Sequence, residues 1–149
     1  MKSVAYGRYG PPDVLELREV AKPEPEGTEL LIGVQATTVT AGDCRIRRAD
    51  PFDARFFNGL FRVGRITVLG FELAGKVEEA GPHAGRFATG DEGLAYTGSG
   101  FGAYAEYMCL AEDGSGGREP LVAAKRAGVT FEEAAAVPTG GLPALDMLK

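Results

Sequence analysis

The chain has 149 residues, of which 44% are hydrophobic and 25% charged, so its composition is that of an ordinary folded domain. Its formal net charge of -5 argues against a nucleic-acid partner, because such proteins usually carry a basic face. No apolar run reaches the roughly 18 residues of a membrane span, and the opening segment MKSVAYGRYG lacks the apolar centre of a signal peptide. We therefore expect a cytoplasmic protein with neither a nucleic-acid nor a membrane partner.

The first part of the chain reads as short strands, because its many glycines and prolines predict frequent turns. The clearest strand covers residues 28–39, where apolar residues recur at every second position and one face is buried. A short helix is expected over 42–49, whereas residues 51–65 are aromatic and basic without periodicity and predict a long loop. The expected strands cover 4–6, 14–20, 28–39, 72–80, 93–97 and 104–110.

After residue 121 the pattern changes from strand to helix. Thr130 and Glu133 match a capping box and predict a helix over 131–137, which ends before Pro138. A further helix opens at residue 141 and stops with the sequence after about two turns. A chain that stops inside a helix is typical of a partial or engineered sequence, so we expect this chain to be a part of a longer protein.

Residues 98–103 satisfy the dinucleotide-binding pattern G-x-G-x-x-A after a predicted strand. In that fingerprint the glycines let a pyrophosphate approach the start of a helix. Here the following residues alternate in polarity like a strand, and no acidic residue follows a second strand at about the usual 20-residue distance. A hairpin turn is therefore the favoured interpretation.

Five segments occur in an order and spacing that resemble the N-terminal, GroES-like catalytic domain of the medium-chain dehydrogenase/reductase family. They are YGPPDVLELREVAKPEP, LLIGVQATTVTAGDCRIR, GFELAGKVEEAG with its Gly-Asp turn, GFGAYAEY and TFEEAAAVPTGGLPALDML. The resemblance covers nearly the whole chain. It implies a mainly β fold, a partly open barrel of short strands with a few short helices, over residues 1–120. Residues 121–149 would then bridge into a Rossmann domain that this chain lacks.

The resemblance also indicates whether the protein has the family's zinc ligands. Zinc-dependent members of the family supply two cysteines and a histidine, and the matching positions here hold Thr40, Phe71 and Thr139. None of these side chains offers a thiolate or an imidazole, and a catalytic zinc needs about three such protein ligands. The resemblance therefore implies the zinc-independent branch of quinone oxidoreductases and enoyl or alkenal reductases, with no metal.

For the whole protein, the resemblance implies an NADPH-dependent reductase of quinones or α,β-unsaturated carbonyls that acts on a small molecule and forms homo-oligomers. The chain alone is expected to be inactive, because its hydride donor has no binding site. Two alternatives remain open. One is a stand-alone binding or assembly module that has lost catalysis, and the other is a zinc-type alcohol dehydrogenase with ligands from other positions.

Thr40 and Arg45 are the predicted catalytic residues on the family match. The Thr40 hydroxyl would donate to the substrate carbonyl or the nicotinamide ribose. Arg45 would polarise a carbonyl or meet a phosphate, with an ion pair to Asp43 as an equally weighted alternative. Asp43 and Glu72 are predicted to support the loops around the cleft rather than to transfer protons.

Three aromatic residues, Phe61, Phe71 and Tyr96, are predicted to line a flat apolar slot for the substrate. For each of them the alternative is simple core packing. Proline stands at 143 where relatives often carry a hydroxyl residue, which changes the usual contact with the nicotinamide. The predicted cofactor-binding residues are Thr139, Gly140 and Pro143.

Overall fold

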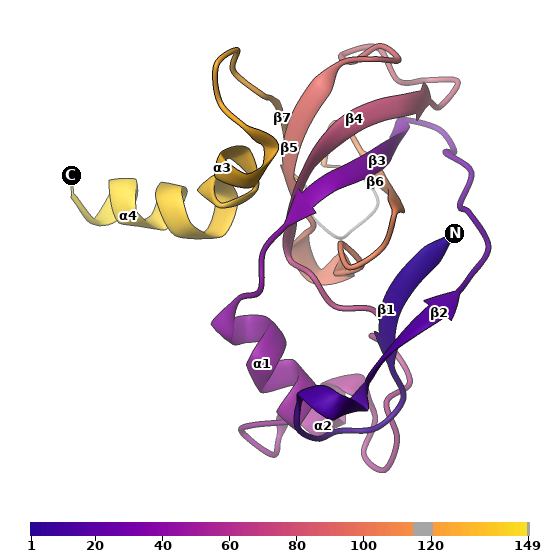
Figure 1. Cartoon of the computed structure of the whole chain (residues 1–149), viewed down its shortest axis with the longest axis vertical. Helices are drawn as coiled ribbons and strands as arrows, with labels where there is room; N and C mark the ends of the chain where they lie inside the picture. Colours follow the sequence, from indigo (N-terminus) through magenta and orange to yellow (C-terminus); the bar gives the residue numbers. More distant parts are fainter. Residues whose placement is uncertain (115–120, 149) are drawn as a thin grey trace.

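Two antiparallel sheets form the body of the molecule in a computed structural model that describes residues 1–114 and 121–148. The smaller sheet pairs β1 (Lys2–Tyr6) with β2 (Leu15–Glu19). The larger sheet curls into a half-barrel (Figure 1). Its strands, in spatial order, are β6 (Tyr107–Ala111), β3 (Glu29–Thr37), β4 (Glu72–Ala80), β5 (Glu92–Tyr96) and β7 (Leu121–Ala124). The predicted fold class, a mainly β and partly open barrel with a few short helices, is confirmed.

The helices are short and lie outside the barrel. Two of them, α1 (Ala41–Arg48) and α2 (Ala54–Asn58), occupy one end of the molecule, and α4 (Leu142–Met147) projects from its side (Figure 1). The helical segments are η1 (Pro12–Val14), α1 (Ala41–Arg48), α2 (Ala54–Asn58), η2 (Gly98–Gly100), α3 (Phe131–Ala135), the π-helical turn η3 (Val137–Gly141) and α4 (Leu142–Met147).

The structure departs from the sequence-based elements at three places. Helix α2 lies inside 51–65, where a loop was expected. Strand β7 extends the sheet at residues for which a change to helix was expected. The helix expected over 131–137 ends at Ala135, and Pro138 lies inside the next helical turn, η3. A proline is tolerated there because the first residues of a helix need no hydrogen bond to their own N–H.

Two further segments, residues 98–103 and 112–119, follow β5 and β6 in the chain. Residues 98–103 contain η2 and lead through an extended segment into β6, not into a helix, which argues against the dinucleotide-binding fingerprint. The favoured hairpin turn is wrong, because β3 and β4 lie between β5 and β6 in the sheet. Residues 112–119, EDGSGGRE, are rich in glycine and polar residues and predict a surface loop, but they lie largely outside the described residues.

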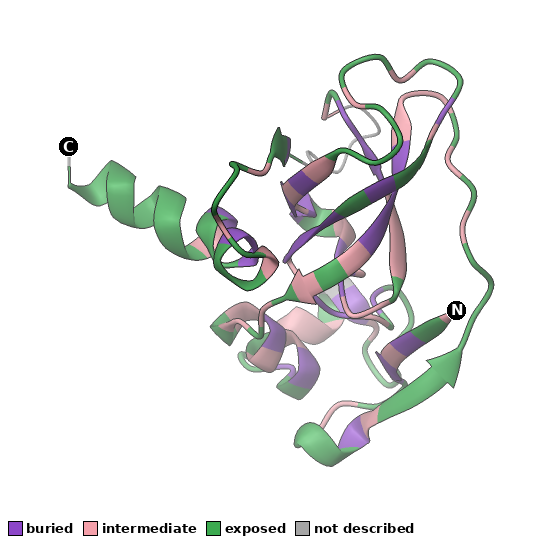
Figure 2. Cartoon of the chain, turned by 45° about the horizontal axis from the view of Figure 1, so that its top comes forward, coloured by how far each residue is buried: buried purple, intermediate pink, exposed green. Residues whose placement is uncertain are grey.

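The main core fills the curl of the larger sheet. Alternate residues of β3, Leu30 and Ile32, are fully buried against Leu73 and Val77 of β4. Figure 2 shows this buried material running along the strands, whereas α4 is exposed along its length. Burial on the sheet and exposure on α4 indicate that the barrel folds around its own core while α4 has no core of its own.

A second, smaller core holds the end of the molecule that carries α1 and α2. The side chain of Asn58 is buried there; its Nδ2 donates to the Tyr6 hydroxyl at 2.8 Å and its Oδ1 accepts from the Ile66 N–H at 2.6 Å. Burial raises the pKa of Tyr6 to about 12, although the Asn58 hydrogen bond opposes that shift. The amide thus joins β1 to the segment that follows α2.

We expect this buried phenol to make the fold sensitive to alkaline pH. An unfolded tyrosine ionises near 10.0, whereas folded Tyr6 keeps its proton to about 12, so stability is present below the first value and lost as pH rises toward the second. The loss should reach about 2–3 kcal/mol. Urea unfolding across this pH range should show that Tyr6→Phe removes this part of the pH dependence. An equally steep fall in the variant would contradict the assignment.

Candidate active site

The start of α1 is fixed by a buried carboxylate. Asp43 is only 1% exposed; its Oδ2 accepts from the Thr40 N–H at 2.8 Å and the Thr40 hydroxyl at 2.7 Å. The Asp43 N–H donates back to the Thr40 hydroxyl, which completes a capping box, and Oδ1 accepts from the Gly70 N–H at 2.9 Å. Burial and the nearby charge of Asp43 raise the pKa of Tyr104, so this phenol stays neutral. The carboxylate therefore ties α1 to the segment that leads into β4.

Phe71 packs directly on α1 and forms the middle of an aromatic row. A Cβ on Gly42 would lie 2.7 Å from the Phe71 ring, so only glycine allows this approach. The Phe71 ring lies 4.5 Å from that of Phe101 and stacks on Tyr96 at 6.5 Å with planes 7° apart. Phe101 holds a φ of 54°, in the region that favours glycine.

Glu72, the next residue, connects the sheet to the helical bridge. Its side chain is buried, 2% exposed, and its Oε2 accepts from the Thr139 N–H in η3 at 2.7 Å. Its Oε1 accepts from the Thr38 hydroxyl, and its backbone oxygen accepts from the Thr37 hydroxyl at 2.7 Å. A buried carboxylate is costly unless such donors satisfy it, so the position of η3 depends on this side chain.

An apolar cavity of about 730 Å³ lies between the edge of the sheet and the η3–α4 segment. Its size suits a flat organic molecule, and the few polar groups among its walls would set that molecule's orientation. The walls come from β5 and β7 on one side and from η3 and α4 on the other. The lining residues are Leu94, Tyr96, Leu121, Ala123, Pro138, Thr139, Leu142, Pro143, Leu145 and Asp146.

The structure brings several of the predicted site residues together. Tyr96, Thr139 and Pro143 line the cavity, and Gly140 lies exposed in η3 beside Thr139. Phe71 reaches this group through its stacking on Tyr96, and Glu72 reaches it through its hydrogen bond to the Thr139 N–H. Two of the three predicted substrate-binding residues, Phe71 and Tyr96, thus lie near the predicted cofactor-binding residues at one edge of the sheet.

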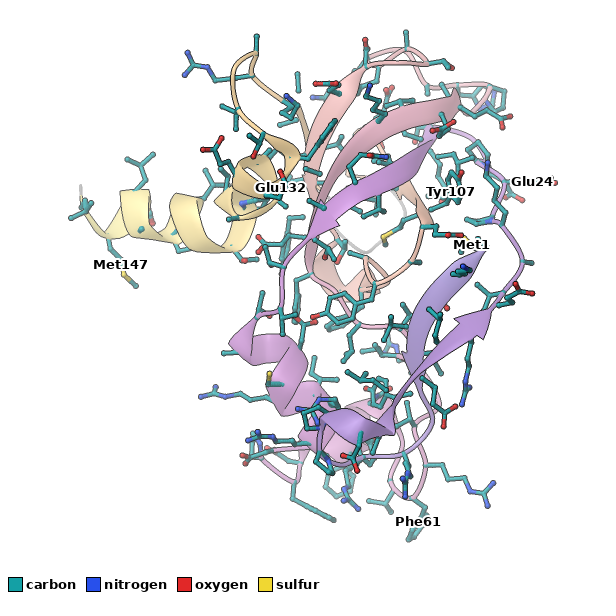
Figure 3. The ribbon with its side chains drawn as sticks, viewed as in Figure 1. Met1, Glu24, Phe61, Tyr107, Glu132 and Met147 are labelled. Carbon is teal, nitrogen blue, oxygen red and sulfur yellow. The ribbon has the colours of Figure 1, made fainter. Side chains whose placement is uncertain are left out.

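Two predicted residues lie apart from this group. Phe61 is 88% exposed and points away from the ribbon at the lower end of the molecule (Figure 3). Arg45 is exposed on α1, and within residues 1–114 and 121–148 no salt bridge joins it to Asp43. Thr40 lies beside the aromatic row, but its hydroxyl is engaged in the helix cap.

The side chains at the family's ligand positions do not fit a zinc ion. The Phe71 ring fills the space between Gly42 and Phe101, and the Thr40 hydroxyl already bonds Asp43. Among the described residues there is no group of three histidine, cysteine, aspartate or glutamate side chains that could hold a metal. The geometry supports binding and orientation by apolar contact instead.

Sequence reasoning missed part of the cavity. Leu121 and Ala123 belong to β7, whose four residues carry no turn signal or clear alternation and were not predicted as a strand. Thr38 was missed as a partner of Glu72, although a glutamate inside an apolar strand requires nearby donors. Leu142 was missed because the local pattern does not show which side of the helix faces the sheet.

A curled half-barrel, with a helical bridge beside an open apolar pocket at the edge of its sheet, defines a GroES-like domain of the alcohol dehydrogenase type. The family model described as the alcohol dehydrogenase GroES-like domain matches residues 26–116, and the chain belongs to this family. The predicted family is therefore confirmed.

The chain is similar to several proteins that are named quinone oxidoreductases. It is 34% identical over 148 residues to the chloroplastic quinone-oxidoreductase homolog of Spinacia oleracea, covering 97% of this chain and 40% of the relative. The quinone oxidoreductase structure from Coxiella burnetii matches with a TM-score of 0.82 at 30% identity, over 99% of this chain and 44% of that one. Escherichia coli quinone oxidoreductase complexed with NADPH shares the fold, with a TM-score of 0.80 at 23% identity over 100% of this chain and 40% of that one. The chain spans about 40% of the length of the curated relative.

Glu72→Leu should loosen η3, because a leucine side chain offers no acceptor to the Thr139 N–H. We expect a loss of about 1–3 kcal/mol in unfolding free energy, the usual cost of leaving a buried donor unpaired. Hydrogen exchange should show faster exchange of the Thr139 amide. Glu79→Leu, an exposed position on the same strand, is the matched control. Unchanged exchange at Thr139 in Glu72→Leu would show that the carboxylate does not hold η3.

Proposed function

We propose that the whole protein is a zinc-independent, NADPH-dependent reductase of quinones or α,β-unsaturated carbonyls. One observation carries this proposal: an aromatic side chain, Phe71, fills the metal-ligand position and stacks on Tyr96 at an apolar cavity. Relatives named quinone oxidoreductases support the substrate class. A flat, uncharged ring is the kind of molecule that such a cavity binds.

The proposed cofactor contacts are Thr139, Gly140 and Pro143. Thr139 and Pro143 line the cavity, and their small, mostly apolar surface fits a nicotinamide ring. The E. coli relative whose structure holds NADPH has the same fold, which supports this choice of cofactor. When bound, reduced nicotinamide would supply the hydride. Because the relatives extend well beyond the matched part, we infer that most of the cofactor site lies outside these residues, and we expect no turnover from the chain alone.

In this proposal the chain's residues act by positioning. Tyr96, backed by the Phe71 ring, would hold the substrate ring flat, and the leucines of the cavity would contact it through apolar surface. Glu72 would keep Thr139 at the cavity wall through the hydrogen bond to its N–H. We also propose that Arg45, exposed on α1, meets a carbonyl or a phosphate. We further propose that the whole protein is cytoplasmic and forms homo-oligomers.

The decisive test is oxidation of NADPH by the full-length protein with a benzoquinone, a naphthoquinone and an enone, each with a chelator present. We expect chelator-resistant turnover of a quinone or an enone. A primary alcohol with NAD serves as the contrasting reaction. Alcohol oxidation that the chelator abolishes would contradict the proposal and favour a zinc-type dehydrogenase. Turnover of none of these substrates would favour a binding module instead.

Thr40 offers a separate test, because its hydroxyl either caps α1 or serves the substrate. Thr40→Val should lose the cap and about 1 kcal/mol of stability, whereas Thr40→Ser keeps the hydroxyl and the stability. We expect kcat of Thr40→Val, measured at a temperature where the variant is fully folded, to stay within about twofold of wild type. A fall of about a hundredfold, restored by Thr40→Ser, would instead show that Thr40 donates to the substrate.

A further inference from the structure

One end of the molecule carries exposed aromatic side chains that the proposed reaction does not use. Phe52, Phe56 and Phe61 are 59%, 74% and 88% exposed, and Leu60 is 38% exposed. They lie in and around α2, on one short stretch of the chain. We call this surface, with the arginines described next, the aromatic–arginine face. Exposed large apolar side chains in such a cluster usually mark an interaction site.

The same stretch is basic, although the protein as a whole is acidic. Residues 44–65 hold six arginines and two aspartates, a net charge of +4. The rest of the chain therefore carries a net charge of -9, which brings the total to -5. Arg47 is buried and donates to the Gly10 carbonyl oxygen, whereas Arg45, Arg48, Arg62 and Arg65 are exposed. A basic end on an acidic chain directs that end toward anionic surfaces.

The outer turn of this face is held by the buried core behind it. The Gly64 N–H donates to the Asn58 carbonyl oxygen at 2.9 Å, and the Tyr9 hydroxyl donates to the Gly59 carbonyl oxygen at 2.8 Å. Gly59 has a φ of 115°, and a Cβ there would lie 2.1 Å from the Arg62 carbonyl oxygen. The turn is therefore tight and specified by glycine, and it presents Phe61 outward, as Figure 3 shows.

The base of the face is also ordered. The Arg55 guanidinium lies 4.9 Å from the ring centroids of both Tyr9 and Phe52. This cation–π contact fixes Phe52 against the second core and leaves its outer surface exposed. Apolar side chains that are already held in an exposed arrangement lose little further freedom when they bind.

We propose that the aromatic–arginine face docks on the surface of an anionic lipid bilayer. Phe56 and Phe61 would enter the boundary between headgroups and acyl chains, and Arg48 and Arg62 would bind lipid phosphates. No helix among the described residues is long and apolar enough to cross a membrane. The sequence-based expectation of no membrane partner rested on such spans, and surface docking needs none. This inference is independent of the proposed reaction.

Charge decides between this partner and the alternatives. Against a second copy of the chain, the residues outside the face carry a net charge of -9 on each copy, so two copies would repel each other. Against a single-stranded nucleic acid, Phe61 lies on an outward turn and not in a groove where bases stack. The exposed apolar surface of α4, with Leu145 57% and Met147 86% exposed, provides a contrast. Residues 131–148 contain three acidic residues and no basic one, so an anionic bilayer should not attract that surface.

The test is flotation of the chain with vesicles of equal parts phosphatidylcholine and phosphatidylglycerol, compared with phosphatidylcholine alone. We expect binding to the anionic vesicles that falls as salt is raised, because the phosphate contacts are screened. Phe56→Ser with Phe61→Ser should lower the partition coefficient by about tenfold or more. Arg48→Glu with Arg62→Glu should abolish binding. Leu145→Ser and Arg126→Glu, exposed positions outside the face, should each change it by less than about twofold.

Four outcomes would overturn the proposal. The first is no flotation with anionic vesicles, and the second is equal loss in the Leu145→Ser control. The third is that light scattering finds a dimer that Phe61→Ser separates. The fourth is that a single-stranded oligonucleotide binds with the same dependence on Phe56 and Phe61. Circular dichroism of each variant would separate these results from unfolding. Because all four phenylalanine and arginine positions are exposed on the surface, we expect every variant to fold.

Discussion

Three consecutive residues at the start of β4 hold the molecule's functional parts together. The Gly70 N–H donates to the buried carboxylate of Asp43, the Phe71 ring rests on Gly42, and the Glu72 carboxylate accepts from the Thr139 N–H. The first two contacts place α1 against the barrel, and the third places η3. The Phe71 ring belongs to the aromatic row and η3 supplies one wall of the cavity, so both features depend on these contacts.

The two carboxylates at this junction have no cationic partner in the salt bridges of the described residues. Backbone N–H groups and threonine hydroxyls satisfy them instead. Such an arrangement has two advantages over an ion pair. Each carboxylate can reach several chain segments at once, and the donors have fixed directions, which specify the geometry as well as the energy. The two carboxylates therefore connect separate chain segments through their hydrogen bonds.

Local patterns predicted most of the barrel. The alternation in residues 28–39 gave β3, and the segment 72–80 gave β4 with its bounds unchanged. Helix α2 and strand β7 were missed because each is held by tertiary contacts: Asn58 at the end of α2 is fixed by Tyr6, and β7 exists through its pairing with β5. The sequence could name Tyr96, Thr139 and Pro143, but only the folded chain shows that they share a cavity. It also could not show that Phe61 lies elsewhere, since the direction of a loop depends on what holds its ends.

The backbone of Phe101 gives the aromatic row an evolutionary consequence. A non-glycine residue at a φ of 54° costs about 1–3 kcal/mol, which the contact of its ring with Phe71 helps to offset. A single change of Phe71 to histidine would remove part of that compensation and still leave Thr40 bound to Asp43. A lineage carrying this row would have to pass through less stable intermediates before it could hold a metal at this position. The aromatic row would therefore oppose the conversion of this position to a metal ligand.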